Sequence, residues 1–391
     1  MTRWIALTFI ALALAAGDAT AALAGAGTAV WVYGAHRWHP STMPGRLAQL
    51  PGAARHLYLS VEDGRRLITD DPGDAGRLAD LLDLAEGRLG FTVDAMLLQD
   101  PAWASDPEGA TARVLRIVAF QRAMQAGGRH GFRGLHFDIE PFSTDEWDCA
   151  GSGDRRTMMH GLQTVFAGIR HAVEASDPDL LLSAALPWWV ISHSTDGTET
   201  PEAGPRAWLE TLDEIVVMVY GDPGGPLVGS SAAGVLERVG GARWSTVPAG
   251  RGFRIGLATY EYRDDAALAA SMREVAAGLD RWPGFRGLAV FAYGQPFNAP
   301  LVTTVSGRVV DGAGRPIAGA TISANGELTH TSRCGLFELR GLPPGLARVM
   351  VEAEGFLPAV VPVAGLRPGH LREIPPVSLK PRQAPAGTAG P

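Results

Sequence analysis

The stretch FRGLHFDIEPF, residues 132–142, alternates apolar with ionisable residues and then ends at a proline and a phenylalanine. In a β-strand alternate side chains share one face, so His136, Asp138 and Glu140 are expected to point the same way. Two neighbouring carboxylates are costly to bury unless they are paired, hydrogen-bonded or used in chemistry. The pattern therefore predicts either a strand with one solvated face or a strand that carries a functional site.

Short β-branched runs alternate with amphipathic helical segments from residue 28 to about 295. The runs are TAVWVYGA, RHLYLSV, FTVDAMLL, FRGLHFDIE, DLLLSAALPWW, DEIVVMVYG, FRIGLATYE and FRGLAVFAYG. Intervening segments such as AGRLADLLDLAEGRL carry leucines at the intervals of one helix face. This alternation predicts an α/β fold, a (β/α)8 TIM barrel. The alternative is an open doubly wound sheet, but no Gly-rich phosphate turn follows the first run.

Near Leu301 the pattern changes to short runs between Gly, Pro and Asn turns, which predicts a small all-β sandwich domain after the barrel. VSGRVVDGAGRPIAGATI, GLFELRGLPPG and VEAEGF resemble the carboxypeptidase regulatory-like domain, a transthyretin-like sandwich. That resemblance implies a spacer or stabilising module. The expected division is a signal peptide at 1–24, the barrel at 25–300, the sandwich at 301–380 and a disordered tail at 381–391.

The amino terminus has the pattern of a secretory signal peptide. A single Arg3 precedes an apolar run from Trp4 to Ala16, which is too short to span a bilayer comfortably, and small residues follow. An uncleaved anchor is the alternative. We therefore expect a secreted or periplasmic protein with no stable membrane insertion after signal removal. Export would permit a disulfide between Cys149 and Cys334, although two free thiols are equally compatible with so distant a pair.

The chain has 391 residues and a formal net charge of −7, with no block of lysine or arginine. This composition argues against a nucleic-acid partner. It contains no signal for an oligomeric state.

The carboxyl ends of the predicted barrel strands, where barrel enzymes build their active sites, carry carboxylates together with aromatic rings. Beyond the residues of the quoted stretch, the set is His36, Trp38, Asp100, Trp103, Trp188, Trp189, Tyr220, Asp222, Glu261 and Tyr293. Pyranose rings present apolar C–H faces that stack on Trp and Tyr, and cleavage of a glycosidic bond needs a carboxylic acid near the leaving oxygen. The set predicts a polysaccharide or oligosaccharide substrate and no cofactor.

The stretch at 132–142 resembles the signature strand of chitinase-type (family 18) glycoside hydrolases, Asp-Gly-x-Asp-x-Asp-x-Glu. Gly134, Asp138 and Glu140 match this pattern, while Arg133 and His136 stand where the first two aspartates belong. The resemblance implies that Glu140 is the general acid. Like-charge coupling to Asp138 is expected to raise the pKa of Glu140.

Three further stretches are similar to the same family, and one of them, IGLATYEY, resembles its Gly-Leu-Pro-x-Tyr-Gly strand. MVYGD matches its Met-x-Tyr-Asp through Tyr220, with the aspartate one residue late at Asp222. The closing run lacks the family's tryptophan, so Phe291 or Tyr293 would take its place. The resemblance implies that Asp138 and Tyr220 orient the substrate's own 2-acetamido group as the nucleophile.

Three alternatives remain open at this stage. The first is a retaining glycosidase with Glu140 and Glu261 as its two carboxylates. The second is a non-catalytic carbohydrate-binding barrel. The third is a metal-dependent polysaccharide deacetylase, whose candidate ligands are His36, His39, Asp100, His136 and Asp138; our preferred interpretation has no metal.

Overall fold

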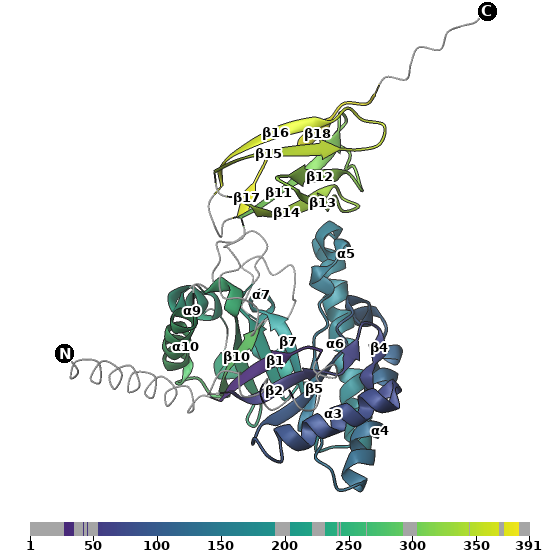
Figure 1. The fold of residues 1–391 in the computed structure, drawn as a ribbon, viewed down its shortest axis with the longest axis vertical. Coiled ribbons are helices and arrows are strands. Elements are labelled where there is room, and N and C mark those ends of the chain that lie inside the picture. Colours follow the sequence, from purple (N-terminus) through teal and green to yellow (C-terminus); the bar gives the residue numbers. More distant parts are fainter. Residues whose placement is uncertain are drawn as a thin grey trace, which may run out of the picture. The chain divides into compact units, whose positions relative to one another are not determined.

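The structure is a computed structural model, and its chain divides into two compact units, described separately below (Figure 1). The described residues are 27–34, 42, 45, 54–191, 204–220, 231–240, 242, 244–262, 264–291, 303–343, 345–366 and 371–382. The predicted signal peptide, most of the predicted tail, and His36, Trp38, His39, Asp222 and Tyr293 lie outside them. One unit contains the barrel. The other contains the sandwich strands together with Phe142–Gly151.

Eight parallel strands close into a barrel in the first unit, in the order β1-β10-β9-β8-β7-β6-β5-β2. They are β1 (Thr28–Val32), β2 (Ala54–Ser60), β5 (Thr92–Leu97), β6 (Gly134–Phe137), β7 (Leu181–Pro187), β8 (Glu214–Met218), β9 (Gly252–Ala258) and β10 (Phe285–Phe291). Each of the eight runs that the sequence predicts as a strand supplies one of them. The TIM-barrel prediction is therefore confirmed.

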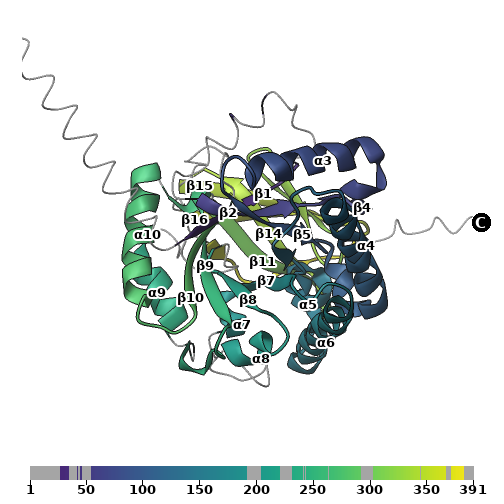
Figure 2. The ribbon, with the colours of Figure 1, turned by 90° about the horizontal axis from the view of Figure 1, so that it is seen from below.

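Helices surround the barrel strands, as Figure 2 shows. The helices among the described residues of this unit are α3 (Pro72–Ala85), α4 (Pro107–Ala126), α6 (Ser152–Ser176), α7 (Trp188–Ile191), α8 (Pro205–Leu209), α9 (Ala232–Gly240) and α10 (Asp265–Leu279). Four 3-10 turns, η2 (Ile68–Asp70), η3 (Pro101–Ser105), η6 (Trp244–Thr246) and η7 (Thr259–Glu261), and the hairpin β3 (Glu62–Asp63) and β4 (Arg66–Leu67) complete the described elements of this unit. A further 3-10 turn, η4 (Pro141–Ser143), begins at the last residue of this unit's first segment and ends in the other unit.

Local sequence explains where several of these helices begin. Asp71, Asp106 and Asp264 each cap a helix by accepting a hydrogen bond from a backbone amide of its first turn. Pro72 and Pro107 follow two of these caps at the first helical position, where a missing N–H costs nothing.

Strand β6 shows the alternation expected from the sequence. Phe137 points outward and stacks on Phe166 of α6 at a centroid distance of 5.7 Å, whereas His136 points into the barrel. Packing explains why residue 134 is a glycine, because a Cβ there would lie 2.4 Å from the carbonyl oxygen of Leu181 on β7. The glycine of the quoted stretch is therefore required for strand pairing.

The amino-terminal layer of the barrel interior is ionic. Asp94 on β5 pairs with Arg133 (2.6 Å) and His56 (3.1 Å), and Glu214 on β8 pairs with Arg254 (3.1 Å). Burial alone would raise the pKa of Asp94, but His56 and Arg133 outweigh it and hold that pKa well below its usual value. Arg133, which departs from the family 18 pattern, thus neutralises a carboxylate that is fully buried.

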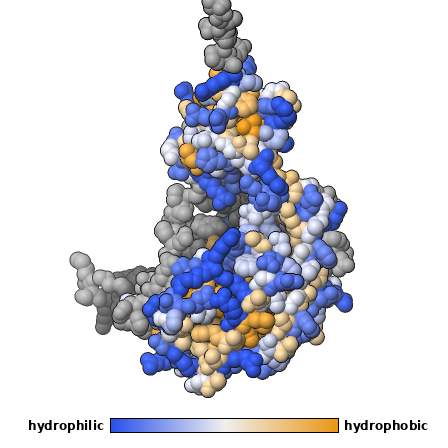
Figure 3. Space-filling model, turned by 90° about the vertical axis from the view of Figure 1, so that its right-hand side faces the viewer, coloured by the Kyte–Doolittle hydropathy of each residue, from blue (hydrophilic) through white to orange (hydrophobic). Residues whose placement is uncertain are grey.

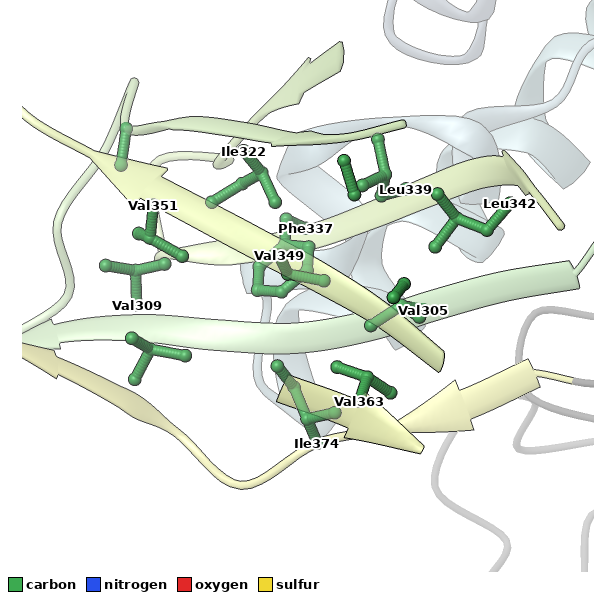
Figure 4. Packing of buried hydrophobic residues seen from close by; sticks show 14 of the residues in the cluster. Val305, Val309, Ile322, Phe337, Leu339, Leu342, Val349, Val351, Val363 and Ile374 are labelled. Atoms are coloured by element: carbon green, nitrogen blue, oxygen red, sulfur yellow. The ribbon is translucent and has the colours of Figure 1, made fainter. Parts of the chain in front are cut away.

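The second unit is a sandwich of two four-stranded sheets. One sheet has the order β14-β11-β17 with β18 also on β11, and the other has the order β13-β12-β15-β16. The strands are β11 (Thr303–Asp311), β12 (Thr321–Ala324), β13 (Glu327–His330), β14 (Leu336–Leu342), β15 (Gly345–Glu352), β16 (Ala359–Leu366), β17 (Leu371–Glu373) and β18 (Val377–Leu379). Apolar side chains from both sheets, among them Val305, Phe337 and Val349, fill the space between them (Figure 4).

Cys149 and Cys334 form a disulfide across a sequence separation of 185 residues. Cys149 ends the short helix α5 (Asp145–Cys149), and Cys334 lies between β13 and β14. Both belong to the second unit. The structure therefore decides the question that the sequence left open in favour of a bonded pair.

Among the described residues, no helix combines the length and the apolar character needed to cross a bilayer. On the face of the molecule drawn in Figure 3, hydrophilic residues alternate with small groups of apolar ones.

Candidate active site

Asp138 and Glu140 follow β6 at the carboxyl ends of the barrel strands, and both residues are partly exposed. Burial and the negative charge of Glu62 raise the pKa of Asp138. Burial and the charge of Asp138 raise the pKa of Glu140. Both shifts favour retention of a proton on the pair at a pH where an ordinary glutamate is ionised. The pair can therefore present a carboxylic acid to a bound molecule near neutral pH.

Tyr33, the residue after β1, lies beside this pair. Its side chain is 43% exposed. Burial raises the pKa of its phenol, and the charges of Asp138 and Glu140 raise it further, so the hydroxyl stays protonated and can donate a hydrogen bond. Tyr33 is not among the site residues that the sequence predicts. Its position at the end of a predicted strand, two residues after the inward-facing Trp31, is the signal that was available.

An aromatic cluster connects the barrel interior with the exposed ring of Tyr33. The rings of Tyr220 and Phe291 stack in parallel, with centroids 5.2 Å apart and planes 2° from parallel. Phe291 also meets Tyr33 edge-on at 6.1 Å, and the buried Trp31 meets both Tyr220 and Phe291 edge-on. Because Phe291 is partly exposed, it can offer apolar surface beside Tyr33.

Gly256 on β9 makes room for this cluster. A Cβ at that position would lie 3.1 Å from the Trp31 ring and 3.3 Å from the Tyr220 ring. A side chain there would have to displace one of the two rings. The glycine therefore helps to fix the position of Tyr220.

His136 lies deeper than expected and is completely buried. Trp31 Nε1 donates to its Nε2 (3.2 Å), its Nδ1 bonds Ser183 Oγ (2.9 Å), and Tyr58 stacks on the imidazole at 3.9 Å. Burial lowers the pKa of His136 to about 3, so the ring is neutral. Both ring nitrogens are occupied, and the structure places His136 in the barrel core in place of the expected substrate contact.

The other described residues of the predicted set divide into two groups. Asp100 accepts a hydrogen bond from the amide of Ala102 (3.0 Å) and so starts the turn η3. Its carboxylate also pairs with Arg65 (2.8 Å), which makes a structural role sufficient to explain it. Trp103, Trp188 and Trp189 are each partly exposed.

Two of these tryptophans contact arginines. The guanidinium of Arg113 lies 5.5 Å from the centre of the Trp103 ring, and that of Arg238 lies 4.5 Å from the Trp188 ring. Those ring faces are therefore already occupied in part.

Glu261 ends η7 after β9 and is only 2% exposed. Its depth contrasts with the partial exposure of Glu140. Among the residues that the structure describes, no three His, Cys, Asp or Glu side chains converge as metal ligands. Of the candidate ligands for a deacetylase metal, His36 and His39 lie outside that part of the chain.

Comparison with known proteins identifies the second unit. Residues 304–379 match the family described as carboxypeptidase regulatory-like domain. The sandwich prediction is therefore confirmed. A search of curated proteins found no match.

Solved structures resemble the chain only distantly. A chitinase from Chromobacterium violaceum ATCC 12472 is 16% identical, with 60% of this chain and 69% of that chain covered and a TM-score of 0.39. The exo-beta-1,4-mannosidase Op5Man5 from Opitutaceae bacterium strain TAV5 is 14% identical, with 68% and 51% covered and a TM-score of 0.42. The chain thus spans about half the length of the mannosidase. At these TM-scores neither likeness bears on the activity of the barrel.

Proposed function

We propose that the barrel is a glycoside hydrolase in which Glu140 is the general acid and Asp138 and Tyr220 assist. The observation that carries the proposal is the Asp138–Glu140 pair, which is partly exposed at the carboxyl ends of the strands and has raised pKa values. A glutamate in an ordinary environment would be ionised at neutral pH and could not protonate a leaving group. The resemblance of residues 132–140 to the family 18 signature supports the same assignment.

The proposed mechanism follows from the two roles that the carboxyl pair offers. Glu140 gives its proton to the glycosidic oxygen as the bond from that oxygen to the anomeric carbon breaks. The carbonyl oxygen of the substrate's 2-acetamido group then bonds the anomeric carbon, and Asp138 and Tyr220 orient and stabilise that group. Water attacks in the second step and returns the proton to Glu140, which restores the acid.

The aromatic cluster supports a carbohydrate as the substrate. Phe291 and Tyr33 present adjoining ring surface, and the pKa of Tyr33 responds to the charge of Glu140. A pyranose can stack its C–H face on such rings. The hydroxyl of Tyr33 supplies a polar partner within the same surface. This combination is what a polysaccharide or oligosaccharide chain needs at the point of cleavage.

The retaining mechanism with Glu261 as nucleophile has less support. A nucleophile must reach the anomeric carbon of a bound sugar, and Glu261 is buried. The substrate-assisted mechanism requires no second exposed carboxylate. We therefore favour it.

We also propose that the protein works outside the cytoplasm, as the amino-terminal sequence predicts. The disulfide between Cys149 and Cys334 supports this proposal, because such bonds persist in the periplasm and in secreted proteins and are rare in the cytosol.

The test is a panel of β-linked polysaccharides and oligosaccharides, with chitooligosaccharides first, in which the full chain is assayed for release of reducing ends. We expect release that a chelator does not affect. Chelator-sensitive release of acetate would favour the deacetylase instead, and binding without turnover would favour the non-catalytic barrel.

Glu140→Gln is the decisive variant, because the amide keeps the shape of the side chain but cannot supply the proton. We expect it to fold and to lose hydrolysis by about 10²- to 10⁴-fold. The matched control is Glu174→Gln, which makes the same change on an exposed part of α6 near the amino ends of the strands. It should keep wild-type activity.

A further inference from the structure

Glu62, at the start of β3, is a buried carboxylate that the proposed mechanism does not use. Its Oε1 accepts a hydrogen bond from Nε of Arg113 on α4 at 2.5 Å. Its Oε2 accepts one from the backbone amide of Gln99 at 3.1 Å. The two oxygens thus meet an arginine and an N–H donor, as a carboxylate requires.

The carboxyl end of β5 lies between Glu62 and the carboxyl pair. Strands β2 and β6 flank β5 on its two sides, so residues that follow them meet at its end. The amide of Asp138 donates to the carbonyl of Leu97 (3.3 Å), and two residues further on the amide of Gln99 donates to Glu62. The backbone at the end of β5 therefore holds both residues, because Leu97 binds the amide of Asp138 and Gln99 binds the carboxylate of Glu62.

In this placement the carboxyl groups of Glu62, Asp138 and Glu140 form a series in which each interacts electrostatically with the next. Burial is the larger cause that raises the pKa of Asp138, and the charge of Glu62 is the second. The charge of Asp138 in turn raises the pKa of Glu140. The phenol of Tyr33, the other described titratable group that responds to the pair, stays neutral near pH 7. Arg113 reaches the series through its bond to Glu62.

Packing does not explain the arrangement. A buried glutamate–arginine pair can often be replaced by apolar residues without loss of stability, and a negative charge beside two further carboxyls adds repulsion. The repulsion works against the folded state, and the ion pair by itself contributes little to offset it. A role in the chemistry of the neighbouring pair accounts for the charge at this position.

We propose that Glu62 is a positioning residue whose carboxyl group, fixed by Arg113 and the amide of Gln99 at the end of β5, keeps a proton on the Asp138–Glu140 pair so that Glu140 is ready to protonate the leaving group. The inference rests on the proposed hydrolase function only for its last step. Retention of the proton is a property of the three carboxyls and can be measured without a substrate.

The first experiment follows the proton directly. The full chain is labelled with ¹³C at the aspartate carboxyls and titrated by NMR, and the Asp138 signal is assigned by its loss in Asp138→Asn. In Glu62→Gln we expect the Asp138 midpoint to fall by about one pH unit, because a nearby like charge has been removed. Arg113→Lys, which keeps the cation, should leave the midpoint unchanged.

The second experiment follows catalysis. In Glu62→Gln the high-pH limb of kcat/KM should move to lower pH, and Glu62→Asp, which restores the charge, should move it back. A merely structural role would lower stability without moving the limb. If Glu62→Gln does not fold, Glu62→Gln/Arg113→Met removes both charges together and should still lower the Asp138 midpoint.

The outcomes separate the two proposals. An unchanged Asp138 midpoint in a folded Glu62→Gln protein overturns the role of Glu62, whatever the activity. Absence of hydrolysis by the wild-type chain on every substrate overturns the proposed function, while the NMR midpoints still decide whether Glu62 holds the proton.

Discussion

Replacing Arg133 with methionine should destabilise the barrel strongly. The guanidinium makes two hydrogen bonds to Asp94, at 2.9 Å from Nε and 2.6 Å from Nη2, and Asp94 is fully buried. Removing one partner of a buried pair leaves a charge without compensation and costs about 3–5 kcal/mol. His56 remains 3.1 Å from Asp94 and Arg133 is itself 26% exposed, so the low end, about 3 kcal/mol, is expected.

The destabilisation should depend on pH in a defined direction. In the wild type the pKa of Asp94 is depressed, so its contribution to stability is present above the unfolded pKa of about 3.9 and is lost as the pH falls through the folded value. Without Arg133 the burial of Asp94 dominates and favours its protonated form. The difference in unfolding free energy between variant and wild type should therefore be largest near pH 7 and shrink toward pH 4.

Urea unfolding followed by tryptophan fluorescence measures this difference, since every tryptophan of the described residues except Trp147 belongs to the barrel unit. In thermal unfolding, about 3 kcal/mol corresponds to a melting temperature roughly 6–12 °C lower. The control is Arg129→Met, which removes a surface arginine paired with Asp80 and Asp83 and should cost less than about 1 kcal/mol. Equal losses in the two variants, or a loss that grows toward pH 4, would refute this reasoning.

Three further predictions concern the site and the disulfide. Asp138→Asn removes the charge that raises the pKa of Glu140, so the high-pH limb of kcat/KM should move to lower pH in a pH–rate profile. Phe291→Ala should raise KM by between about two- and tenfold, with a smaller effect on kcat, in steady-state kinetics on oligosaccharides; an effect confined to kcat would contradict a stacking role. Cys149→Ser/Cys334→Ser should lower the unfolding free energy by at most about 5 kcal/mol, the chain-entropy value for a closed loop of 185 residues. Chemical unfolding with and without a reductant measures this, and a reductant that destabilises the variant as much as the wild type would contradict it.

The fold was predictable from the sequence because its signals are local. Each barrel strand is a short run of buried residues, and the leucine spacing of α3 or the capping aspartate of α4 needs no distant partner to be recognised. The change to turn-rich alternation after residue 300 likewise marks the sandwich without reference to the barrel.

The site was predictable only in part. The alternation of residues predicts which face of a strand a side chain occupies, but not how deeply that side chain lies inside the barrel. Asp138 and Glu140 follow the last residue of β6 and stay partly exposed, whereas His136 on the same face lies one step deeper and is enclosed by Trp31, Tyr58 and neighbouring groups. The same limit applies to Asp100. A carboxylate at a strand end can start a turn as readily as bind a substrate.

Tyr33 and Glu62 were missed for a different reason. The pKa of Tyr33 responds to the charges of Asp138 and Glu140, and the charge of Glu62 raises the pKa of Asp138. These partners lie more than seventy positions apart in the chain, so the relations exist only after the barrel has closed. Tyr33 could have been found from its place at a strand end. Glu62 had no such signal, because it reaches the pair through the end of β5.

The measurement that tests the central claim most directly compares Glu140→Gln with the wild type on two glycosides of the same sugar. One has a natural sugar as its leaving group and needs a proton; the other has 2,4-dinitrophenolate, which leaves without one. We predict that kcat/KM falls by at least about 10²-fold on the first and far less on the second. Equal losses on both glycosides, or wild-type turnover of the natural linkage, would contradict the assignment of Glu140 as the proton donor.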